Sequence, residues 1–418
     1  MGELKGACIF AQSGGPTSVI NASAAGVIQT ALKIPAITHV FGAAHGIKGI
    51  LGEKIFDMSK EDPRELGLLI NTPSSALGSV RYKLKHFDED DTDYKKILDV
   101  FQKHNIRYAF YNGGNDSMDT CNKISKYMEK SGYECRVFGV PKTIDNDLWG
   151  TDHCPGFGSA AKYIATSFME VSLDAKVYDT GMVIVIEVMG RNAGWLTASA
   201  AIAGAKGLGP DLIYLPELPI TIDKILGDVE SVYAANGSAI VAISEGLKDD
   251  KGTLVSEMNY RERGGVDAFG HAQLGGAAHT LADIIKTNMN VKVRPIELSL
   301  LQRCAAHCAS RVDIDESYAA GKMAVEQAVA GKSGYMVAFE RGSGPGYECN
   351  LKLVDVKDVA NKEKKVPREW INEEGNGINQ PLVDYALPLI QGDPRIECED
   401  GLPRFARLKK VPVGQGKA

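Results

Sequence analysis

Three short polar stretches of the sequence contain residue types suited to binding phosphate groups. They read SGGP (13–16), GGNDS (113–117) and PKTIDND (141–147). Glycines allow backbone N–H groups to approach phosphate oxygens, and a helix that starts beside them adds partial positive charge. The third stretch adds a lysine, a hydroxyl and two carboxylates, which packing does not require. The stretches together predict a phosphate site, in which a carboxylate must either hold a metal ion or keep a ligand out.

Each polar stretch follows an apolar run typical of a buried strand. The runs are ACIFA (7–11), IRYAFY (106–111) and RVFGV (136–140). In an open parallel α/β sheet, ligands bind at the edge formed by the C-terminal ends of the strands. Similar runs recur later in the chain and alternate with helical patterns, as in a parallel α/β sheet; they are MVIVIEV (182–188), DLIYL (211–215), AIVAIS (239–244), IELSLL (296–301) and GYMVAF (334–339). These are more units than one small sheet holds, so we expect two sheets, divided near residues 153–159.

Composition and charge favour a water-soluble, mildly acidic protein. The chain has 418 residues, 44% of them hydrophobic and 24% charged, with a formal net charge of −6. This acidic balance argues against nucleic acid or an anionic membrane as a partner. No signal peptide is visible, and the most apolar stretch, 193–205, is too short to span a bilayer. Eight scattered cysteines predict reduced thiols and a cytoplasmic location.

Two other motifs are weaker candidates for sites. GFGSAA (156–161) fits a dinucleotide-binding pattern, but no apolar strand precedes it. CAAHC (304–308) contains possible metal ligands, but no second Cys/His pair completes a tetrahedral site. We therefore expect no dinucleotide role in the first case and buried small residues in the second.

In order and spacing, seven motifs resemble the phosphofructokinase family over about residues 7–345. They are SGGPTSVINA (13–22), LGSVRY (77–82), GGNDS (113–117), PKTIDNDLWGTD (141–152), EVMGRNAGW (187–195), SEG (244–246) and LLQR (300–303). The resemblance implies an α/β fold of two similar Rossmann-like, three-layer α/β/α domains with mostly parallel sheets and a C-terminal extension. Residues 1–156 with about 302–345 would form the phosphoryl-donor domain. Residues 157–301 with about 346–372 would form the sugar-phosphate domain, and 373–418 the extension.

The same resemblance implies the reaction and its residues. Asp145 would take the proton from the 1-hydroxyl of fructose 6-phosphate, with Thr143 and Arg191 as further catalytic residues and Asp147 ordering the loop. Phosphoryl transfer mainly needs positioning and charge neutralisation, which fits these residue types. The diphosphate would be bound by Gly14, Gly15, Arg81, Gly114, Asp116, Ser117 and Lys142. The sugar phosphate would be bound by Thr143, Ile144, Asp145, Met189, Gly190, Arg191, Glu245, Arg294, Leu300 and Arg303.

Asp116 and Lys142 indicate the phosphoryl donor. ATP-dependent members resembling this chain have glycine at both positions, whereas pyrophosphate-dependent members have an acid and a lysine. An aspartate where a nucleotide α-phosphate would lie repels it by roughly 4 kcal/mol at 4 Å and an effective dielectric near 20. We therefore predict pyrophosphate as donor, in a freely reversible step of glycolysis. The alternatives are an ATP-dependent or mixed-donor kinase, and a regulatory paralogue that binds sugar phosphate without turnover.

The metal site and the assembly are also implied by the resemblance. Mg²⁺ would be the cofactor, held by Asn115 and Asp116, although Asn115 stands where the family usually has an aspartate. Leu300 similarly replaces a polar residue, often histidine. Arg294 matches an arginine that reaches a neighbouring subunit, which implies a homodimer or homotetramer with shared sites.

Overall fold

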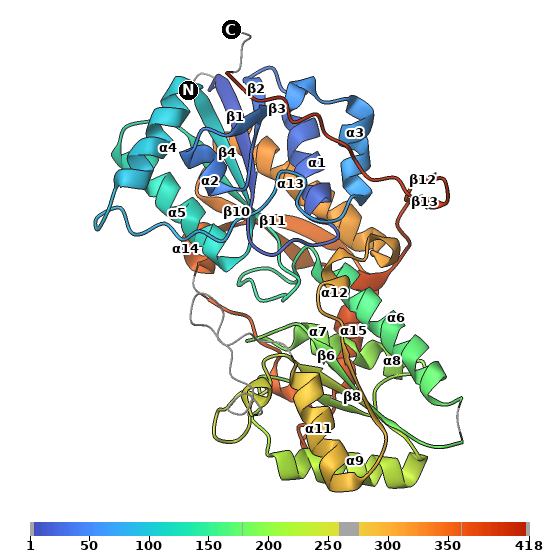
Figure 1. Cartoon of the computed structure of the whole chain (residues 1–418). Coiled ribbons are helices and arrows are strands. Elements are labelled where there is room, and N and C mark those ends of the chain that lie inside the picture. Colours follow the sequence, from blue (N-terminus) through green and yellow to red (C-terminus); the bar gives the residue numbers. More distant parts are fainter. Residues whose placement is uncertain (1–3, 178, 259–275, 361, 415–418) are drawn as a thin grey trace.

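The computed structural model describes residues 4–177, 179–258, 276–360 and 362–414. Its larger sheet has seven strands in the order β11-β10-β5-β4-β1-β2-β3 and occupies the upper half of Figure 1. The strands are β1 (Gly6–Gln12), β2 (Ile37–Ala43), β3 (Ile55–Asp57), β4 (Ile106–Gly113), β5 (Arg136–Pro141), β10 (Tyr335–Arg341) and β11 (Cys349–Asp355). The inner pairs are parallel, and the two edge strands β3 and β11 are antiparallel to their neighbours.

The second sheet has four parallel strands in the order β7-β8-β6-β9 and lies in the lower half of Figure 1. Its strands are β6 (Val183–Val188), β7 (Leu212–Tyr214), β8 (Ala239–Ser244) and β9 (Val293–Glu297). Beyond both sheets, β12 (Cys398–Glu399) and β13 (Leu402–Pro403) form a short hairpin.

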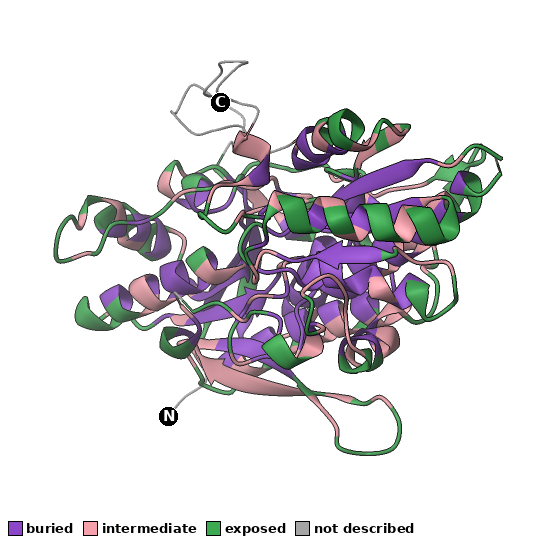
Figure 2. Ribbon diagram, turned by 90° about the horizontal axis from the view of Figure 1, so that it is seen from below, coloured by how far each residue is buried: buried purple, intermediate pink, exposed green. Residues whose placement is uncertain are grey.

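Helices cover both faces of each sheet, which explains why the central strands are apolar throughout. Figure 2 shows these buried strands enclosed by helices whose outer faces are exposed. The helices are α1 (Ile20–Ala31), α2 (Ile47–Leu51), α3 (Pro63–Leu68), α4 (Thr92–Lys103), α5 (Asn115–Lys130), α6 (Phe157–Ala175), α7 (Trp195–Ser199), α8 (Ala201–Gly204), α9 (Ile222–Asn236), α11 (Ala277–Met289), α12 (Leu301–Cys304), α13 (Arg311–Val329), α14 (Val356–Val359) and α15 (Gln380–Ala386).

The alternation of side chains along β1 shows the layering of the first unit. Ala7, Ile9 and Ala11 pack with residues of α2, α4 and α5. Cys8 and Phe10 point to the opposite face, against α1 and α13. Because successive side chains of a strand alternate between faces, both faces of the sheet are buried, as the predicted three-layer architecture requires.

The second unit repeats this arrangement around β6. Ile184, Ile186 and Val188 pack against α6, α7 and α8, whereas Val183 and Val185 pack against α9 and α11. The predicted fold of two mostly parallel three-layer units is therefore confirmed, with seven strands in one sheet and four in the other.

Strand β11 differs from the predicted division of the chain. Residues from about 346 were expected with the second unit, but β11 pairs antiparallel along the whole of β10, with Tyr335 opposite Asp355. A short connection after β10 brings the chain back as the antiparallel neighbour of that strand. Because β11 is an edge strand, it is only half-buried, and its apolar pattern is therefore weak. We retain the other domain boundaries as a proposal.

The residues after 373 contact both units. Helix α15 packs into the apolar core of the second unit. Farther along, the Asp57 N–H donates to the Val411 carbonyl and the Val413 N–H donates to the Ile55 carbonyl, so the chain end lies beside β3 (Figure 1). The extension is thus part of the packed structure in its described portion.

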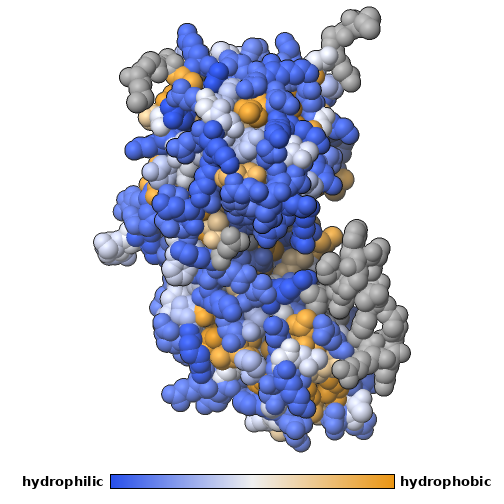
Figure 3. All heavy atoms as spheres, turned by 90° about the vertical axis from the view of Figure 1, so that its left-hand side faces the viewer, coloured by the Kyte–Doolittle hydropathy of each residue, from blue (hydrophilic) through white to orange (hydrophobic). Residues whose placement is uncertain are grey.

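Two findings bear on the expectation that no segment of the chain spans a bilayer. The face drawn in Figure 3 is mostly hydrophilic. Among the residues that the structure describes, there is no helix with both the length and the apolar character needed to cross a bilayer.

The GFGSAA segment begins α6, and a protein carboxylate occupies the start of this helix. Asp313, which is buried, accepts hydrogen bonds from the N–H groups of Gly156 and Ser159, both at 2.9 Å. These donors, which a dinucleotide phosphate would need, are already satisfied.

We expect Asp313→Ala to lower the free energy of unfolding by about 2 to 3 kcal/mol, because it leaves two buried N–H groups without acceptors. Denaturant unfolding measures the change. Glu170→Ala, at an exposed position of α6, whose first N–H groups Asp313 binds, is the control and should change stability by less than about 0.5 kcal/mol. Equal losses in the two variants would contradict the capping role.

Candidate functional site

The C-terminal ends of β1, β4 and β5 converge on a cavity of about 740 Å³. All three predicted phosphate loops line it, together with the loop that precedes α4. The lining residues are Ser13, Gly14, Gly15, Val80, Arg81, Tyr82, Lys83, Gly114, Asn115, Asp116, Ser117, Lys142, Thr143, Asp145, Asp147 and Glu363. The structure thus brings together every residue predicted to bind the diphosphate, although their roles remain predictions.

Lys142 is the central cation of this cavity. Its side chain is buried, with 3% of the residue exposed, and its ammonium donates to the Gly15 carbonyl at 2.7 Å. A Cβ on Gly14 would lie 3.1 Å from the Lys142 Nζ atom, and the φ of Gly14 is +76°, so glycine is required there. Burial lowers the pKa of Lys142 to about 8, although Asp145 and Asp147 oppose this shift.

Asp145 has the properties of a proton acceptor. It is half-buried, and its backbone N–H donates to the Thr143 hydroxyl at 3.1 Å, which fixes the turn. Burial, followed by the nearby carboxylates of Asp147 and Glu245, raises the pKa of Asp145 to about 7. A carboxylate with this pKa can take up and release a proton near neutral pH.

Asn115 and Asp116 begin helix α5 and point in different directions. The Asn115 Nδ2 group donates to Asp147 Oδ2 at 3.2 Å, whereas its Oδ1 atom is buried without a partner in the described structure. The side chain of Asp116 is 82% exposed, and its Oδ1 atom lies 3.9 Å from Lys83 Nζ. An orphaned amide oxygen beside a carboxylate supplies the hard oxygen donors that Mg²⁺ prefers.

Residues from the edge of the second sheet form the other side of the site. The Gly190 N–H donates to Glu245 Oε1 at 3.2 Å, and the Met189 N–H donates to Gln302 Oε1 at 3.1 Å. Arg303, on α12, reaches the first unit, because a Cβ on Gly15 would lie 3.0 Å from its Nη1 atom. Arg303 therefore connects the predicted sugar-phosphate residues with the predicted donor loop.

Of the ten predicted substrate residues, only Thr143 and Asp145 line the cavity itself. Ile144 is buried in the apolar core around α6. Arg191 and Arg294 are exposed, the latter on the edge strand β9. Leu300 is 55% exposed and precedes α12, because β9 ends at Glu297 rather than extending through the apolar run to 301.

Lys83, Tyr82 and Glu363 line the cavity but were absent from the predicted site. Lys83 follows Arg81 by two residues, and this proximity was an available signal. Glu363 had none, because it reaches the site through an isolated antiparallel bridge to Leu148 and also accepts from Asn192 Nδ2 at 3.1 Å.

The fold and site define a class: a two-unit α/β protein with a polar cavity at the C-terminal edge of its larger sheet. The chain belongs to the phosphofructokinase family, whose sequence model, described as "Phosphofructokinase", matches residues 7–296.

Curated relatives are similar over nearly the whole chain. The pyrophosphate–fructose 6-phosphate 1-phosphotransferase of Halomonas elongata is 44% identical over 97% of this chain and 96% of its own length. The protein of the same name from Methylococcus capsulatus is 42% identical over the same shares. The crystal structure of the pyrophosphate-dependent phosphofructokinase of Marinobacter aquaeolei has a TM-score of 0.88 and 41% identity, covering 99% of this chain and 98% of that one.

Gly14→Ala tests the contact between the first loop and Lys142. We expect it to weaken binding of inorganic phosphate about tenfold, because the new methyl group displaces the ammonium. Isothermal titration measures the affinity. Gly132→Ala is the matched control, since Gly132 has a φ of +66° and no atom within 4 Å of the added Cβ. Both variants should lose about 1 to 2 kcal/mol of stability; equal phosphate affinities would contradict the contact.

Proposed function

We propose that this chain transfers a phosphoryl group from pyrophosphate to the 1-hydroxyl of fructose 6-phosphate, giving fructose 1,6-bisphosphate and phosphate. The observation that carries the proposal is the placement of Asp145 beside Lys142 in one cavity, a proton acceptor next to a buried cation. Sequence similarity along nearly the full chain supports the same reaction. The step is a reversible one of glycolysis, because pyrophosphate and the sugar phosphate ester have similar transfer energies. We place it in the cytoplasm.

In the proposed mechanism, this chain orients two substrates and moves one proton. Asp145 accepts the proton of the 1-hydroxyl as its oxygen attacks the donor phosphorus in line with the leaving phosphate. Lys142, Arg81 and the N–H groups of the glycine loops stabilise the charge on the transferring group. Thr143 fixes the backbone of Asp145, and Arg303 with Glu245 holds the sugar phosphate.

The oxygen donors present also fit a magnesium ion. Asn115 Oδ1 is buried without a partner. Asp116 is the next residue in the chain, and the Asp147 carboxylate accepts a hydrogen bond from Asn115 Nδ2. Asn115 would hold Mg²⁺ with one of these carboxylates while the ion keeps most of its waters. Such an ion would supply positive charge that offsets the negative charge of the donor.

Asp116 is the proposed determinant of donor choice. Its exposure weakens any repulsion of a nucleotide, since solvent and salt screen the charge, so the effect is smaller than the roughly 4 kcal/mol of a partly buried pair. The volume of the side chain at the start of α5 therefore contributes alongside its charge. Asp116→Asn, which keeps the volume, separates the two contributions.

Some of the residues predicted to bind substrate are exposed, and this exposure supports a site that is shared between subunits. Arg294 lies on an edge strand, and Leu300 and Leu301 are 55% and 60% exposed. Large apolar side chains exposed together near a site are typical of protein interfaces. We propose a homodimer or homotetramer in which Arg294 reaches the sugar phosphate of a neighbouring subunit.

The two shifted pKa values predict a bell-shaped pH profile for kcat/KM with pyrophosphate. Asp145 is protonated, and cannot accept a proton, below about pH 7. Lys142 loses its positive charge above about pH 8. Activity should therefore fall on both sides of this range. Lys142→Arg keeps the charge at high pH and should remove the alkaline limb, as steady-state rates will show; an unchanged limb would exclude Lys142 as its source.

Donor preference is the direct test of the proposed function. With purified protein, Mg²⁺ and fructose 6-phosphate, turnover with pyrophosphate should exceed turnover with ATP by at least about 100-fold, an effect of about 2.7 kcal/mol. Replacing Asp116 and Lys142 together by glycine should raise turnover with ATP, because it removes both the obstructing acid and the cation suited to pyrophosphate.

The other outcomes separate the alternatives. ATP turnover equal to or above pyrophosphate turnover in the wild type would favour the ATP-dependent or mixed-donor kinase. Binding of fructose 6-phosphate without turnover under either donor would favour the regulatory paralogue. A double variant that gains nothing with ATP would contradict the exclusion mechanism while leaving the reaction intact.

A further inference from the structure

Asn146 stands between Asp145 and Asp147 in an unusual backbone conformation. Its φ is +55°, in the left-handed region, and its side chain is fully buried. Asparagine enters this region more readily than other non-glycine residues, but the conformation still costs free energy that its hydrogen bonds must offset. The conformation turns the chain between two carboxylates of the cavity, so whatever holds Asn146 also sets the positions of Asp145 and Asp147.

Both polar groups of the Asn146 side chain are held. The Cys154 N–H donates to Asn146 Oδ1 at 2.9 Å, which closes the loop on itself. Asn146 Nδ2 donates to the hydroxyl of Tyr385 at 2.8 Å, and that hydroxyl donates to the Asp152 carbonyl at 2.8 Å. Tyr385 lies on α15, far along the chain, and its oxygen connects two points of the same loop.

Lys364 provides a second connection from the C-terminal region. Its N–H donates to the Asp147 carbonyl at 2.8 Å. Its ammonium donates to the carbonyls of Thr151 and Asp152 at 3.2 and 2.6 Å. Burial lowers the pKa of Lys364, which is consistent with an ammonium held inside the structure by these carbonyls.

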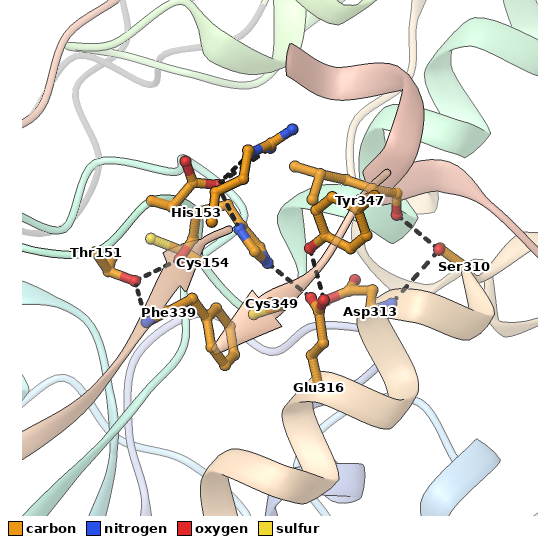
Figure 4. Close-up of polar contacts among 12 residues, drawn as sticks. Thr151, His153, Cys154, Ser310, Asp313, Glu316, Phe339, Tyr347 and Cys349 are labelled. Carbon is orange, nitrogen blue, oxygen red and sulfur yellow. Dashed lines mark hydrogen bonds and ion pairs between the residues drawn. The ribbon is translucent and has the colours of Figure 1, made fainter. Parts of the chain in front are cut away.

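The far end of the loop is fixed by His153 (Figure 4). Its Nδ1 atom lies 2.8 Å from Asp152 Oδ2 and its Nε2 atom 2.7 Å from Glu316 Oε2. Burial acts to lower the pKa of His153, but the two carboxylates outweigh it and raise the pKa. Tyr347 donates to the other Glu316 oxygen at 2.6 Å.

Cys349 completes a group with His153 and Glu316 that is close enough to hold a metal ion. Both imidazole nitrogens are already paired with carboxylates, however, and Tyr347 satisfies the remaining Glu316 oxygen. The cluster is therefore a hydrogen-bonded anchor for the end of the loop.

Arg341 joins this anchor to Tyr385. It donates to Asp152 Oδ2 at 3.1 Å and to the Tyr385 carbonyl at 2.9 Å, and its guanidinium lies 4.8 Å from the centre of the Tyr385 ring. The ring of Tyr385 also packs with Trp195 and Trp370, at centroid distances of 5.4 and 5.5 Å. The position of the hydroxyl is thus set independently of the bond to Asn146.

We propose that Tyr385 is a positioning residue of the reaction: its hydroxyl holds Asn146 in the left-handed conformation that directs Asp145 into the cavity. Tyr385 lies outside residues 7–296, which the family model matches, so the C-terminal segment has a role in the site that the shared motifs do not contain. The inference rests on the proposed phosphoryl transfer.

Tyr385→Phe tests the proposal, since it removes one oxygen and keeps the ring. We expect kcat to fall about 10- to 100-fold, with the KM of either substrate changed less than about threefold, because the base is misplaced while the binding groups remain. A large loss in kcat with a nearly unchanged KM is the readout that general destabilisation would not produce.

Tyr214→Phe is the matched control. Tyr214 is more deeply buried than the half-buried Tyr385, and its hydroxyl also makes a side-chain hydrogen bond, to Asp228 at 3.0 Å, but it lies in the core of the second unit. This variant should lose at least as much stability and keep the wild-type kcat and KM. A fall in kcat equal to that of Tyr385→Phe would mean that general destabilisation explains both.

Asn146→Gly gives an independent readout, because it keeps the backbone conformation accessible and leaves the packing of Tyr385 intact. It should lower kcat with little change in KM, as is expected of Tyr385→Phe, even if the latter variant fails to fold. The double variant should be no worse than the more impaired single variant, since both remove the same connection.

Two results would overturn the inference: wild-type kcat in Tyr385→Phe or Asn146→Gly, or fully multiplicative losses in the double variant. Failure of the proposed function is distinguishable, because the wild-type protein itself would then show no turnover with pyrophosphate.

Discussion

Removal of the Lys142 ammonium and the Asp145 carboxylate from water is the constraint on which the site depends. A buried charge is costly unless oxygens or opposite charges surround it. Lys142 obtains the Gly15 carbonyl and the field of two carboxylates, and its pKa still falls, whereas that of Asp145 rises. The pKa values of both groups therefore lie close to neutral pH, as acid–base chemistry in this range requires. An anionic ligand would supply the negative charge needed to balance the buried ammonium of Lys142.

The loop that carries Lys142 and Asp145 must be held rigidly, because a flexible loop would let both charged groups return to water. Residues 142–154 leave the end of β5, carry both carboxylates and return to α6. They are held at Asn146 by Tyr385, at Asp147 by Lys364 and at His153 by Glu316. All three anchors come from the last third of the chain, so a motif near residue 145 depends on the C-terminal third of the sequence.

Much of this could be predicted from local sequence. The glycine loops follow apolar strands, and the C-terminal ends of parallel strands meet at one edge, so the cavity and most of its lining residues were predictable. The edge strand β11 was assigned to the wrong unit because its half-buried pattern is weak and its pairing depends on a hairpin. Glu363 and Tyr385 carry no local signal, since each reaches the site only through long-range contacts.

The sequence by itself therefore determined the class of fold, the phosphate loops and the residues able to perform the chemistry, because periodicity, glycine placement and charge act over a few neighbouring residues. The tertiary structure decided which groups are buried and by what they are held: the direction of Asp116, the unpaired oxygen of Asn115, and the connection of Asn146 to Tyr385. Burial and long-range hydrogen bonds arise only when distant segments pack together, and these determine the pKa of Asp145 and the position of its carboxylate.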